Sequence, residues 1–216
     1  MARAPIRRPL LLAVAGMVGT GKTTLTAALA QRFGLQTAFE SVDDDNPWLA
    51  PFYGPEPDAR ARYALRLQLH FLATRFRDMR RLRARGGGWL LDRTWYEDAE
   101  IFARGHYESG VLSADEYRLY EQLYAELLTG PGAKPPRLLI YLDGPLDVIV
   151  ARIAQRGREA ERETDVAYWA ALHARYAAWI EGFTRCPVLR LDVREYDLVA
   201  EPEAIDGIAR KVRMAL

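Results

Sequence analysis

Near its N-terminus the chain reads Gly16-Met17-Val18-Gly19-Thr20-Gly21-Lys22-Thr23, and this stretch decides the fold. It has the form Gly-x-x-x-x-Gly-Lys-Ser/Thr, with an apolar run before it (10–15) and a helix-compatible run after it (24–33). Glycine lets successive backbone N–H groups turn toward an anion, and a helix N-terminus adds the positive end of its dipole. A strand, this loop and a helix in series therefore predict a binding site for the phosphates of a nucleoside triphosphate.

The polar residues of this phosphate loop have distinct predicted roles. Lys22 supplies a positive charge for the β- and γ-phosphates, and the Thr23 hydroxyl is suited to coordinate Mg²⁺. A glycine-rich turn before an ordinary helix is the alternative, but the complete pattern in this setting disfavours it. We expect the following residues to bind ATP: Gly16, Met17, Val18, Gly19, Thr20, Gly21, Lys22, Thr23 and Thr24.

Apolar runs alternate with helical patterns along the chain. Strands are predicted at 10–15, 36–39, 89–91, 138–142 and 188–191. Helices are predicted at 24–33, 58–83, 97–104, 115–128, 146–154, 166–183 and 202–214, with a capping box of Ser113 and Glu116. This alternation predicts an α/β fold of the P-loop NTPase type, similar to nucleoside and nucleotide kinases: a central parallel five-stranded sheet flanked by helices. We expect one domain over residues 1–216.

Composition narrows the possible partners and compartment. The single cysteine, Cys186, permits no disulfide within the chain, which is typical of a cytoplasmic protein. A net charge of +1 provides no general attraction to nucleic acid or to acidic membranes, so we expect neither as a partner. The basic start of the chain and the run 10–15 mimic a secretion signal, but that run leads directly into the phosphate loop, so we expect no cleavage.

Acidic residues close several predicted strands, where the ligands of parallel α/β sheets bind. Glu40 is placed to accept a proton from a hydroxyl that attacks the γ-phosphate, although a solvent-exposed turn acid explains its position equally well. Asp92 is placed to hold Mg²⁺, and Arg93 to clamp a phosphate or the acceptor; a strand-end salt bridge is the alternative.

A cluster of arginines follows the fourth predicted strand: Arg152, Arg156 and Arg158. Several guanidinium groups on a movable segment would close over a triphosphate and neutralise its charge. A solvated helix face is the alternative, and Gly157 within the cluster favours a bend. We therefore predict an arginine-rich lid at about 152–163.

Taken in this order, the phosphate loop, Glu40, Asp92-Arg93-Thr94 and the Arg-Ile-x-x-Arg-Gly-Arg run at 152–158 resemble the deoxyribonucleoside kinase family. The resemblance is closest to its bacterial deoxyadenosine/deoxyguanosine kinase branch, is especially strong over 92–103, and extends to about Trp179. It implies transfer of the γ-phosphoryl group of ATP to the 5′-hydroxyl of a purine deoxyribonucleoside, in nucleotide salvage. Deoxyadenosine, deoxyguanosine and deoxycytidine remain open as acceptors.

The resemblance also implies catalytic roles. Glu40 matches the general base for the 5′-hydroxyl, Arg93 the arginine beside that hydroxyl, and Asp92 the acid near Mg²⁺. Two positions depart from the usual family pattern: Ser41 replaces proline after the base, and Thr94 replaces serine in the triplet.

Nucleoside-binding roles follow from the same resemblance. Gln68 matches the glutamine that reads the base edge, and Arg75 matches an arginine that pairs with an acid at Asp98. In the family this pair accompanies acceptance of purines or cytosine and crowds out thymine. Glu161 matches a lid acid that contacts the sugar 3′-hydroxyl, with Tyr53 as its partner despite a stretched spacing. Phe102 is a further candidate near the sugar or base.

Two other functions remain open on the sequence. A nucleoside-monophosphate kinase of the thymidylate type would need basic groups for the acceptor's own phosphate, and a regulatory module would bind a triphosphate without transferring it. The resemblance further implies a homodimer, formed through the predicted helices at 58–83 and 97–104.

Overall fold

The computed structural model describes residues 10–38, 46–130, 133–157 and 165–216. Glu40, Ser41, Arg158 and Glu161 lie outside these residues. The chain forms two compact units. The sheet unit comprises residues 1–39, 87–93 and 135–216, and the helical unit comprises 40–86 and 94–134. The prediction of a single domain stays a prediction, and each unit is described by itself.

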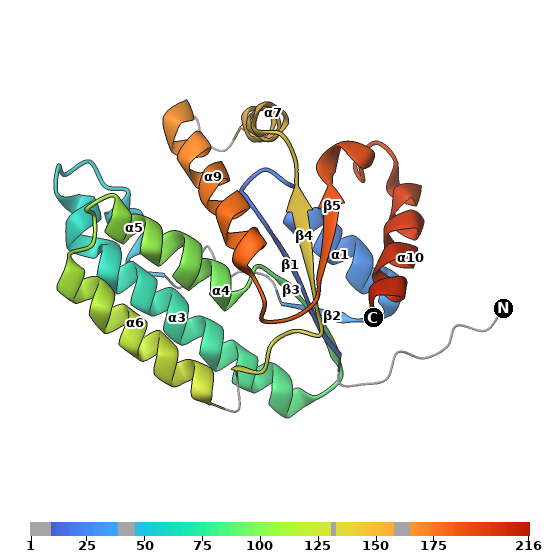
Figure 1. Cartoon of the computed structure of the whole chain (residues 1–216), viewed down its shortest axis with the longest axis horizontal. Helices are drawn as coiled ribbons and strands as arrows, with labels where there is room; N and C mark the ends of the chain where they lie inside the picture. Colours follow the sequence, from blue (N-terminus) through green and yellow to red (C-terminus); the bar gives the residue numbers. More distant parts are fainter. Residues whose placement is uncertain (1–9, 39–45, 131–132, 158–164) are drawn as a thin grey trace. The chain divides into compact units, whose positions relative to one another are not determined.

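The sheet unit is built on five parallel strands in the order β2-β3-β1-β4-β5 (Figure 1). This confirms the predicted parallel five-stranded sheet. The middle strands are apolar and buried along most of their length, as expected for a sheet covered on both faces. The strands are β1 (Leu10–Gly16), β2 (Gln36–Ala38), β3 (Gly88–Asp92), β4 (Leu138–Asp143) and β5 (Val188–Asp192).

Helices cover both faces of this sheet. On one face, α1 (Lys22–Phe33) and α10 (Ile205–Ala215) pack over a core that includes Leu191 and Ile140. On the other face, α9 (Val166–Gly182) places Trp179 against Tyr141, with α7 (Leu146–Arg156) beside it (Figure 1). The alternation of neighbouring residues between the two faces follows from the twofold period of a strand.

Several predicted helix boundaries in the sheet unit differ from the structure by one to three residues, among them those of α7 and of the C-terminal helix. α7 runs to Arg156 and ends at Gly157, whose φ of 66° and ψ of 29° stop the helix. The helix therefore ends within the arginine cluster, and the predicted bend stays a prediction because the next residues lie outside the described ones. The C-terminal helix was predicted from Pro202, but the chain there forms a 3₁₀ turn, Pro202–Ala204, before α10. Another 3₁₀ turn, Val193–Glu195, follows β5.

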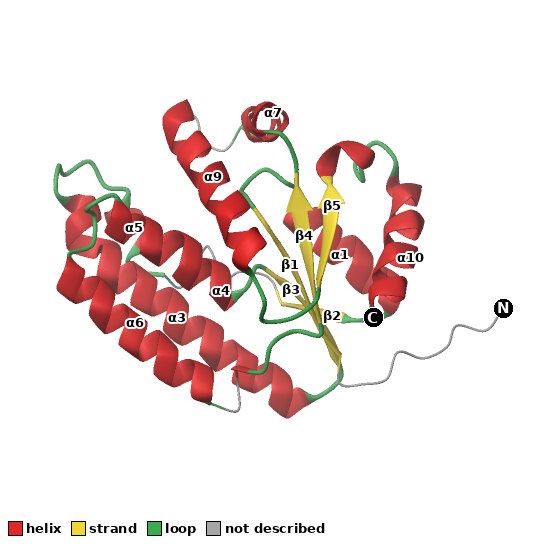
Figure 2. Cartoon of the chain, in the orientation of Figure 1, coloured by secondary structure: helices red, strands yellow, loops and turns green. Residues whose placement is uncertain are grey.

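The helical unit contains no strand among its described residues (Figure 2). Its longest helix, α3, packs on α2, η1 and α6. The predicted capping box is confirmed, since Ser113 Oγ accepts the Glu116 N–H at 3.3 Å and the Glu116 carboxylate accepts the Ser113 N–H at 2.9 Å. The elements are α2 (Leu49–Phe52), α3 (Ala59–Arg85), α4 (Trp95–Glu97), η1 (Asp98–Ala103), α5 (Arg104–Glu108) and α6 (Ala114–Thr129).

The helix predicted at 97–104 is longer and less regular than expected. It extends from Trp95 to Glu108, and its middle part, η1, is a π-helix of six residues. Thr94 starts it with a second capping box, in which its Oγ1 accepts the Glu97 N–H at 3.3 Å. The π-turn adds about one residue to a turn, which a 3.6-residue pattern cannot reveal.

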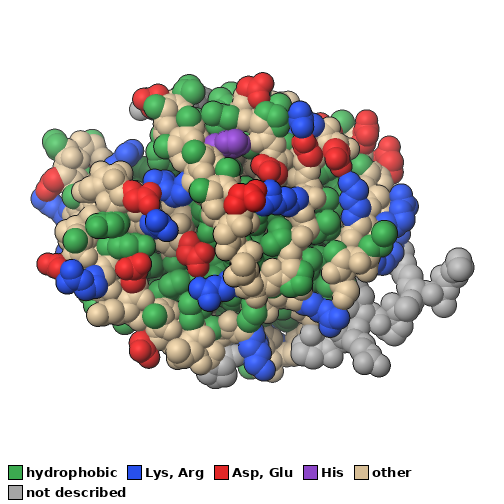
Figure 3. All heavy atoms as spheres, viewed as in Figure 1, with side chains coloured by type: hydrophobic (Ala, Val, Ile, Leu, Met, Phe, Trp, Pro, Cys, Tyr) green, Lys and Arg blue, Asp and Glu red, His purple; other side chains and the backbone are tan. Residues whose placement is uncertain are grey.

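The charged surface is mixed. Figure 3 shows Lys and Arg side chains interspersed with Asp and Glu over the visible face. Within the described residues, none of the helices is both long and apolar enough to cross a membrane.

Candidate active site

The phosphate loop links β1 to α1 and curls through glycines in conformations that other residues rarely adopt. Gly19 has a φ of 85°, and Gly21, at the start of α1, has a φ of 89°. A Cβ atom at Gly19 would lie 2.5 Å from Ile153 Cγ1 of α7, which is closer than packed carbon atoms approach. Both backbone shape and available space therefore require glycine at position 19.

One carbonyl group of the loop organises its polar side chains. Met17 O accepts the Thr20 hydroxyl at 2.8 Å and the Lys22 ammonium at 3.0 Å. Lys22 is only 8% exposed, so its charge is held over the loop. A phosphate oxygen is a stronger acceptor for an ammonium than a neutral carbonyl, because the hydrogen bond is then charge-assisted on both sides. The loop is thus already shaped for an anion.

The metal-binding prediction concerns two residues that lie in direct contact. The Thr23 hydroxyl donates to Asp92 Oδ2 at 2.6 Å, and Asp92 is 5% exposed at the end of β3. A hydroxyl and a carboxylate are the hard oxygen ligands that Mg²⁺ takes, and Mg²⁺ completes its octahedron with waters and substrate phosphates. Thr23 and Asp92 therefore fit a Mg²⁺ ion bound together with a triphosphate.

Arg93 follows Asp92 directly and carries backbone strain. Its φ of 73° is the single positive value among the non-glycine residues described. Its N–H donates to Val14 O of β1 at 2.9 Å, and its side chain is buried, with Nη1 donating to the Tyr176 hydroxyl at 3.3 Å. Strain of this kind costs about 1 to 3 kcal/mol and clusters at functional sites, which supports the predicted role of Arg93.

The arginines predicted as a lid lie partly within α7. Arg152 Nη2 donates to Val193 O in the turn after β5 at 2.8 Å, and Arg156 is the last residue of the helix. Arg158 lies outside the described residues. The helical part of the cluster is therefore held on the sheet unit, and its action on a triphosphate stays a prediction.

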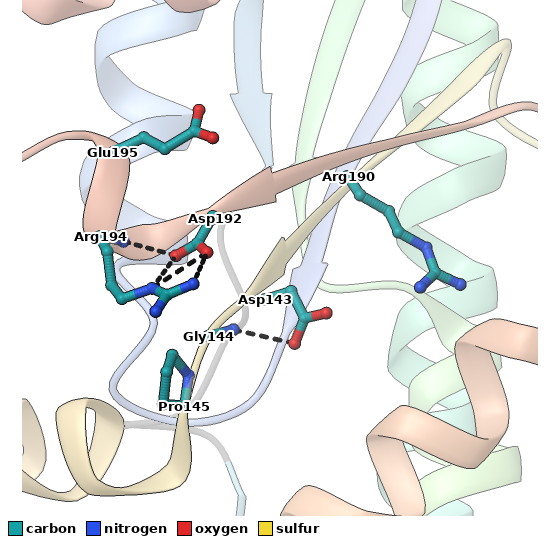
Figure 4. A pocket seen from close by; sticks show the side chains of 7 residues that line it. All are labelled: Asp143, Gly144, Pro145, Arg190, Asp192, Arg194 and Glu195. Atoms are coloured by element: carbon teal, nitrogen blue, oxygen red, sulfur yellow. Dashed lines mark hydrogen bonds and ion pairs between the residues drawn. The ribbon is translucent and has the colours of Figure 1, made fainter.

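A pocket of about 400 Å³ opens beside the carboxyl ends of β4 and β5 (Figure 4). Two of its charged groups pair with each other, as Asp192 binds the Arg194 guanidinium at 2.6 Å, whereas Arg190 binds Glu181, which does not line the pocket, at 2.8 Å. Asp143, the last residue of β4, lines this pocket and accepts the N–H of Gly144 at 2.8 Å.

In the helical unit, Arg75 of α3 and Asp98 of η1 form the ion pair that the resemblance predicted. Arg75 Nε lies 2.9 Å from Asp98 Oδ2, and Nη2 lies 3.4 Å from Oδ1. Their side chains are 12% and 4% exposed. Because the pair is nearly dry, its charges act strongly on any group that approaches it.

Gln68 lies two turns before Arg75 on α3. It is 3% exposed, and its Oε1 atom has no hydrogen-bond partner among the described residues. A buried amide oxygen without a partner is rare in folded proteins and usually marks a place for a ligand or a water. This observation supports the predicted contact of Gln68 with the base.

The other predicted nucleoside contacts are less well defined. Tyr53 follows α2, is 58% exposed, and packs edge-on against Phe52 with ring centres 4.9 Å apart. Phe102 is half-buried in η1. Glu161 lies outside the described residues.

Sequence reasoning missed Tyr176 as a partner of Arg93, because that residue is one of several aromatic positions on the apolar face of α9. It also missed the cap formed by Thr94 and Glu97, although Thr-x-x-Glu is a readable signal.

A family model described as deoxynucleoside kinase matches residues 12–216. This chain belongs to the deoxynucleoside kinase family. The match extends beyond Trp179, where the resemblance was predicted to end. Members of this family are ATP-dependent phosphotransferases that phosphorylate deoxynucleosides, which confirms the predicted enzyme class and disfavours both alternatives.

Several characterised relatives cover most of the chain. The chain is 42% identical to the deoxyadenosine/deoxycytidine kinase of Bacillus subtilis, over 94% of this chain and 91% of the relative. It is 33% identical to the deoxyadenosine kinase of Dictyostelium discoideum, over 90% and 75%. A solved deoxyadenosine kinase from M. mycoides with bound dCTP superposes with a TM-score of 0.77 at 24% identity, covering 95% of this chain and all of the other; this likeness shows the fold.

Proposed function

We propose that this deoxynucleoside kinase transfers the γ-phosphoryl group of ATP to the 5′-hydroxyl of purine deoxyribonucleosides, with deoxyadenosine preferred and deoxycytidine also accepted. The buried Arg75–Asp98 pair carries the proposal. Adenine and cytosine each present an exocyclic amine, whereas thymine presents a carbonyl oxygen at the same edge. A carboxylate accepts a hydrogen bond from the amine and repels the carbonyl. Guanine also presents a carbonyl oxygen there, so deoxyguanosine would depend on the donors of Arg75.

Gln68 supports the same choice of base. Its amide presents a donor and an acceptor side by side, which match the ring nitrogen and the amine of adenine or cytosine. The buried Oε1 is the acceptor that lacks a partner among the residues described. The Bacillus subtilis relative, named a deoxyadenosine/deoxycytidine kinase, has the substrate range that this chemistry favours.

Phosphoryl transfer requires groups on both sides of the reacting bond. In the proposal, Glu40 accepts the proton of the 5′-hydroxyl, and Arg93 holds that hydroxyl in line with the γ-phosphate. Lys22, Arg152, Arg156 and Arg158 bind the phosphates and oppose the charge that spreads over the transferred group. Thr23 and Asp92 would hold Mg²⁺, which neutralises charge on the β- and γ-phosphate oxygens.

The remaining parts of the proposal concern the sugar, assembly and compartment. Glu161 and Tyr53 are proposed to bind the 3′-hydroxyl, and Phe102 to line the sugar or base. A homodimer in the cytoplasm, acting in nucleotide salvage, completes the proposal. Sedimentation equilibrium of the purified chain tests the assembly, and a mass of about 24.5 kDa would contradict the dimer.

The activity is tested by supplying ATP and Mg²⁺ with deoxyadenosine, deoxyguanosine, deoxycytidine or thymidine, using the wild-type chain and Glu40→Gln. We expect deoxyadenosine to be phosphorylated fastest and thymidine slowest, with a loss of at least about 10²-fold in Glu40→Gln. Thymidine turnover alone would overturn the role given to Arg75 and Asp98. Turnover of thymidine monophosphate, without any of the four nucleosides, would instead support the nucleotide kinase alternative.

A further inference from the structure

Besides Gln68 Oε1, other buried polar atoms of the helical unit lack a hydrogen-bond partner among the described residues, and one of them is the hydroxyl oxygen of Tyr120 on α6. Tyr120 is 1% exposed. A buried hydroxyl that makes no hydrogen bond destabilises the folded chain relative to a phenylalanine ring of the same shape. Its presence therefore points to a hydrogen bond that forms in another state of the protein, such as the substrate complex.

The neighbours of Tyr120 indicate which group that bond would serve. α6 turns Tyr120 and Tyr124, one helical turn apart, toward the interior of the helical unit. The Tyr124 hydroxyl donates to Glu100 Oε1 in η1 at 3.3 Å, so this face of α6 packs on η1. Asp98 lies two residues before Glu100 in the same π-helix.

Electrostatics agrees with this placement. Burial raises the pKa of Tyr120 above its ordinary value, and the negative charge of Asp98 raises it further. The positive charge of Arg75 acts on the pKa in the opposite direction, with a smaller effect. The Tyr120 hydroxyl therefore stays protonated, and it lies near enough to Asp98 and Arg75 for their charges to act on it.

We propose that Tyr120 is a positioning residue for base selection, whose hydroxyl donates a hydrogen bond to the Asp98 carboxylate when a deoxynucleoside is bound. The inference rests on the proposed function and deepens it. A carboxylate has room for several donors on its two oxygens. Arg75 holds Oδ2 closely, at 2.9 Å, but reaches Oδ1 only at 3.4 Å. A second donor fixes the carboxylate while one oxygen accepts the exocyclic amine of the base.

The test compares two acceptors that differ by one group, deoxyadenosine and purine 2′-deoxyriboside, which lacks the amine. In Tyr120→Phe we expect kcat/KM for deoxyadenosine to fall about tenfold, mainly through KM, which matches the loss of one hydrogen bond to a charged group. The purine deoxyriboside, measured by KM or as an inhibitor, should be affected less than twofold. The melting temperature of the free protein should stay the same or rise, because an unsatisfied hydroxyl is removed.

Tyr124→Phe is the matched control, since it removes a hydroxyl from the same face of the same helix. It should leave the preference for deoxyadenosine over purine deoxyriboside unchanged. Equal kinetics of wild type and Tyr120→Phe would overturn the inference, as would equal losses with both acceptors accompanied by a lower melting temperature. A wild-type chain that phosphorylates no deoxynucleoside would overturn the proposed function itself, so the two failures are distinguishable.

Discussion

In the sheet unit, Met17 O accepts hydrogen bonds from both Thr20 and Lys22, and Thr23 is paired with Asp92. In the helical unit, Gln68 Oε1 and Tyr120 Oη are buried without partners among the described residues. The polar side chains of the phosphate loop are thus bound by the loop itself and by Asp92, whereas the proposed base-binding residues hold polar atoms that a ligand would complete. Binding the phosphates, which all nucleoside triphosphates share, is suited to a loop whose groups are already positioned. Selecting one base is suited to buried polar groups that a ligand completes.

The largest effect should come from changing the phosphate loop. Lys22→Ala removes the buried charge of the phosphate loop, and we expect kcat/KM to fall about 10³-fold, since a preorganised cation acts directly on the transferred group. Lys211→Ala is the control, because that exposed lysine of α10 pairs with Glu195 on the surface. Steady-state kinetics measures both, and similar rates for the two variants would contradict the role of Lys22.

A smaller effect is expected from changing the proposed base-binding residues of the helical unit, and it should alter both stability and base selectivity. Asp98→Ala removes the carboxylate that pairs with Arg75 in a nearly dry site, which should reduce the free energy of unfolding by about 3 to 5 kcal/mol. It should also narrow the preference for deoxyadenosine over thymidine by about tenfold or more. Asp115→Ala, which breaks an exposed pair with Arg118, should cost less than about 1 kcal/mol. Urea unfolding and steady-state kinetics compare the two variants. Equal losses of stability would contradict the structural importance of the buried pair.

Substituting two glycines of the phosphate loop distinguishes the effect of backbone conformation from the effect of packing. Gly19→Ala and Gly21→Ala both place a side chain at a positive φ, but only at Gly19 would the added Cβ meet another atom, Ile153 Cγ1 at 2.5 Å. We expect Gly19→Ala to lose about 1 to 3 kcal/mol more stability than Gly21→Ala, which is the typical cost of overpacking. Thermal unfolding measures the difference. Equal losses would mean that strain alone dictates glycine at both positions.

A smaller effect is expected from removing the hydroxyl that binds the Arg93 side chain. Tyr176→Phe removes the hydroxyl that accepts the Arg93 guanidinium at 3.3 Å, and kcat should fall about three- to tenfold with little change in the KM for ATP. Tyr168→Phe, on an exposed position of the same helix, should leave kcat unchanged. An unchanged kcat in Tyr176→Phe would show that Arg93 is positioned without this hydrogen bond.

The smallest effect should be present near neutral pH and disappear in acid. The Arg194 side chain, together with its backbone N–H, lowers the pKa of Asp192 to about 2, below the value of about 3.9 in an unfolded chain. Asp192 therefore stabilises the folded state above about pH 4, and this contribution is lost as the pH falls toward 2. The difference in melting temperature between wild type and Asp192→Asn should shrink across that window. A difference that stays constant from pH 6 to pH 2.5 would contradict the assigned pair.

Prediction from the sequence was most accurate for features that depend on residues close together in the chain. The phosphate loop, the five strands and the Ser113–Glu116 cap depend on residues close together in the chain, so their patterns were readable and the structure confirms them. The π-helix η1 was missed, because its extra residue per turn is accommodated by packing of α3 and α6 around four buried positions. The contact of Arg93 with Tyr176 joins residues 83 positions apart, and no local signal encodes it.

By itself, the sequence determined that this chain is a phosphate-loop kinase with a parallel sheet. Glycine spacing and apolar runs are local features of the sequence, and the resemblance rests on short motifs that can be read along it. Only the tertiary structure decided which side chains are dry and which lack partners. The burial of Arg75 with Asp98, the vacant oxygen of Gln68 and the hydroxyl of Tyr120 all depend on three helices packing together. Desolvation is a property of the assembled interior, and the choice of base that we propose for these residues depends on it.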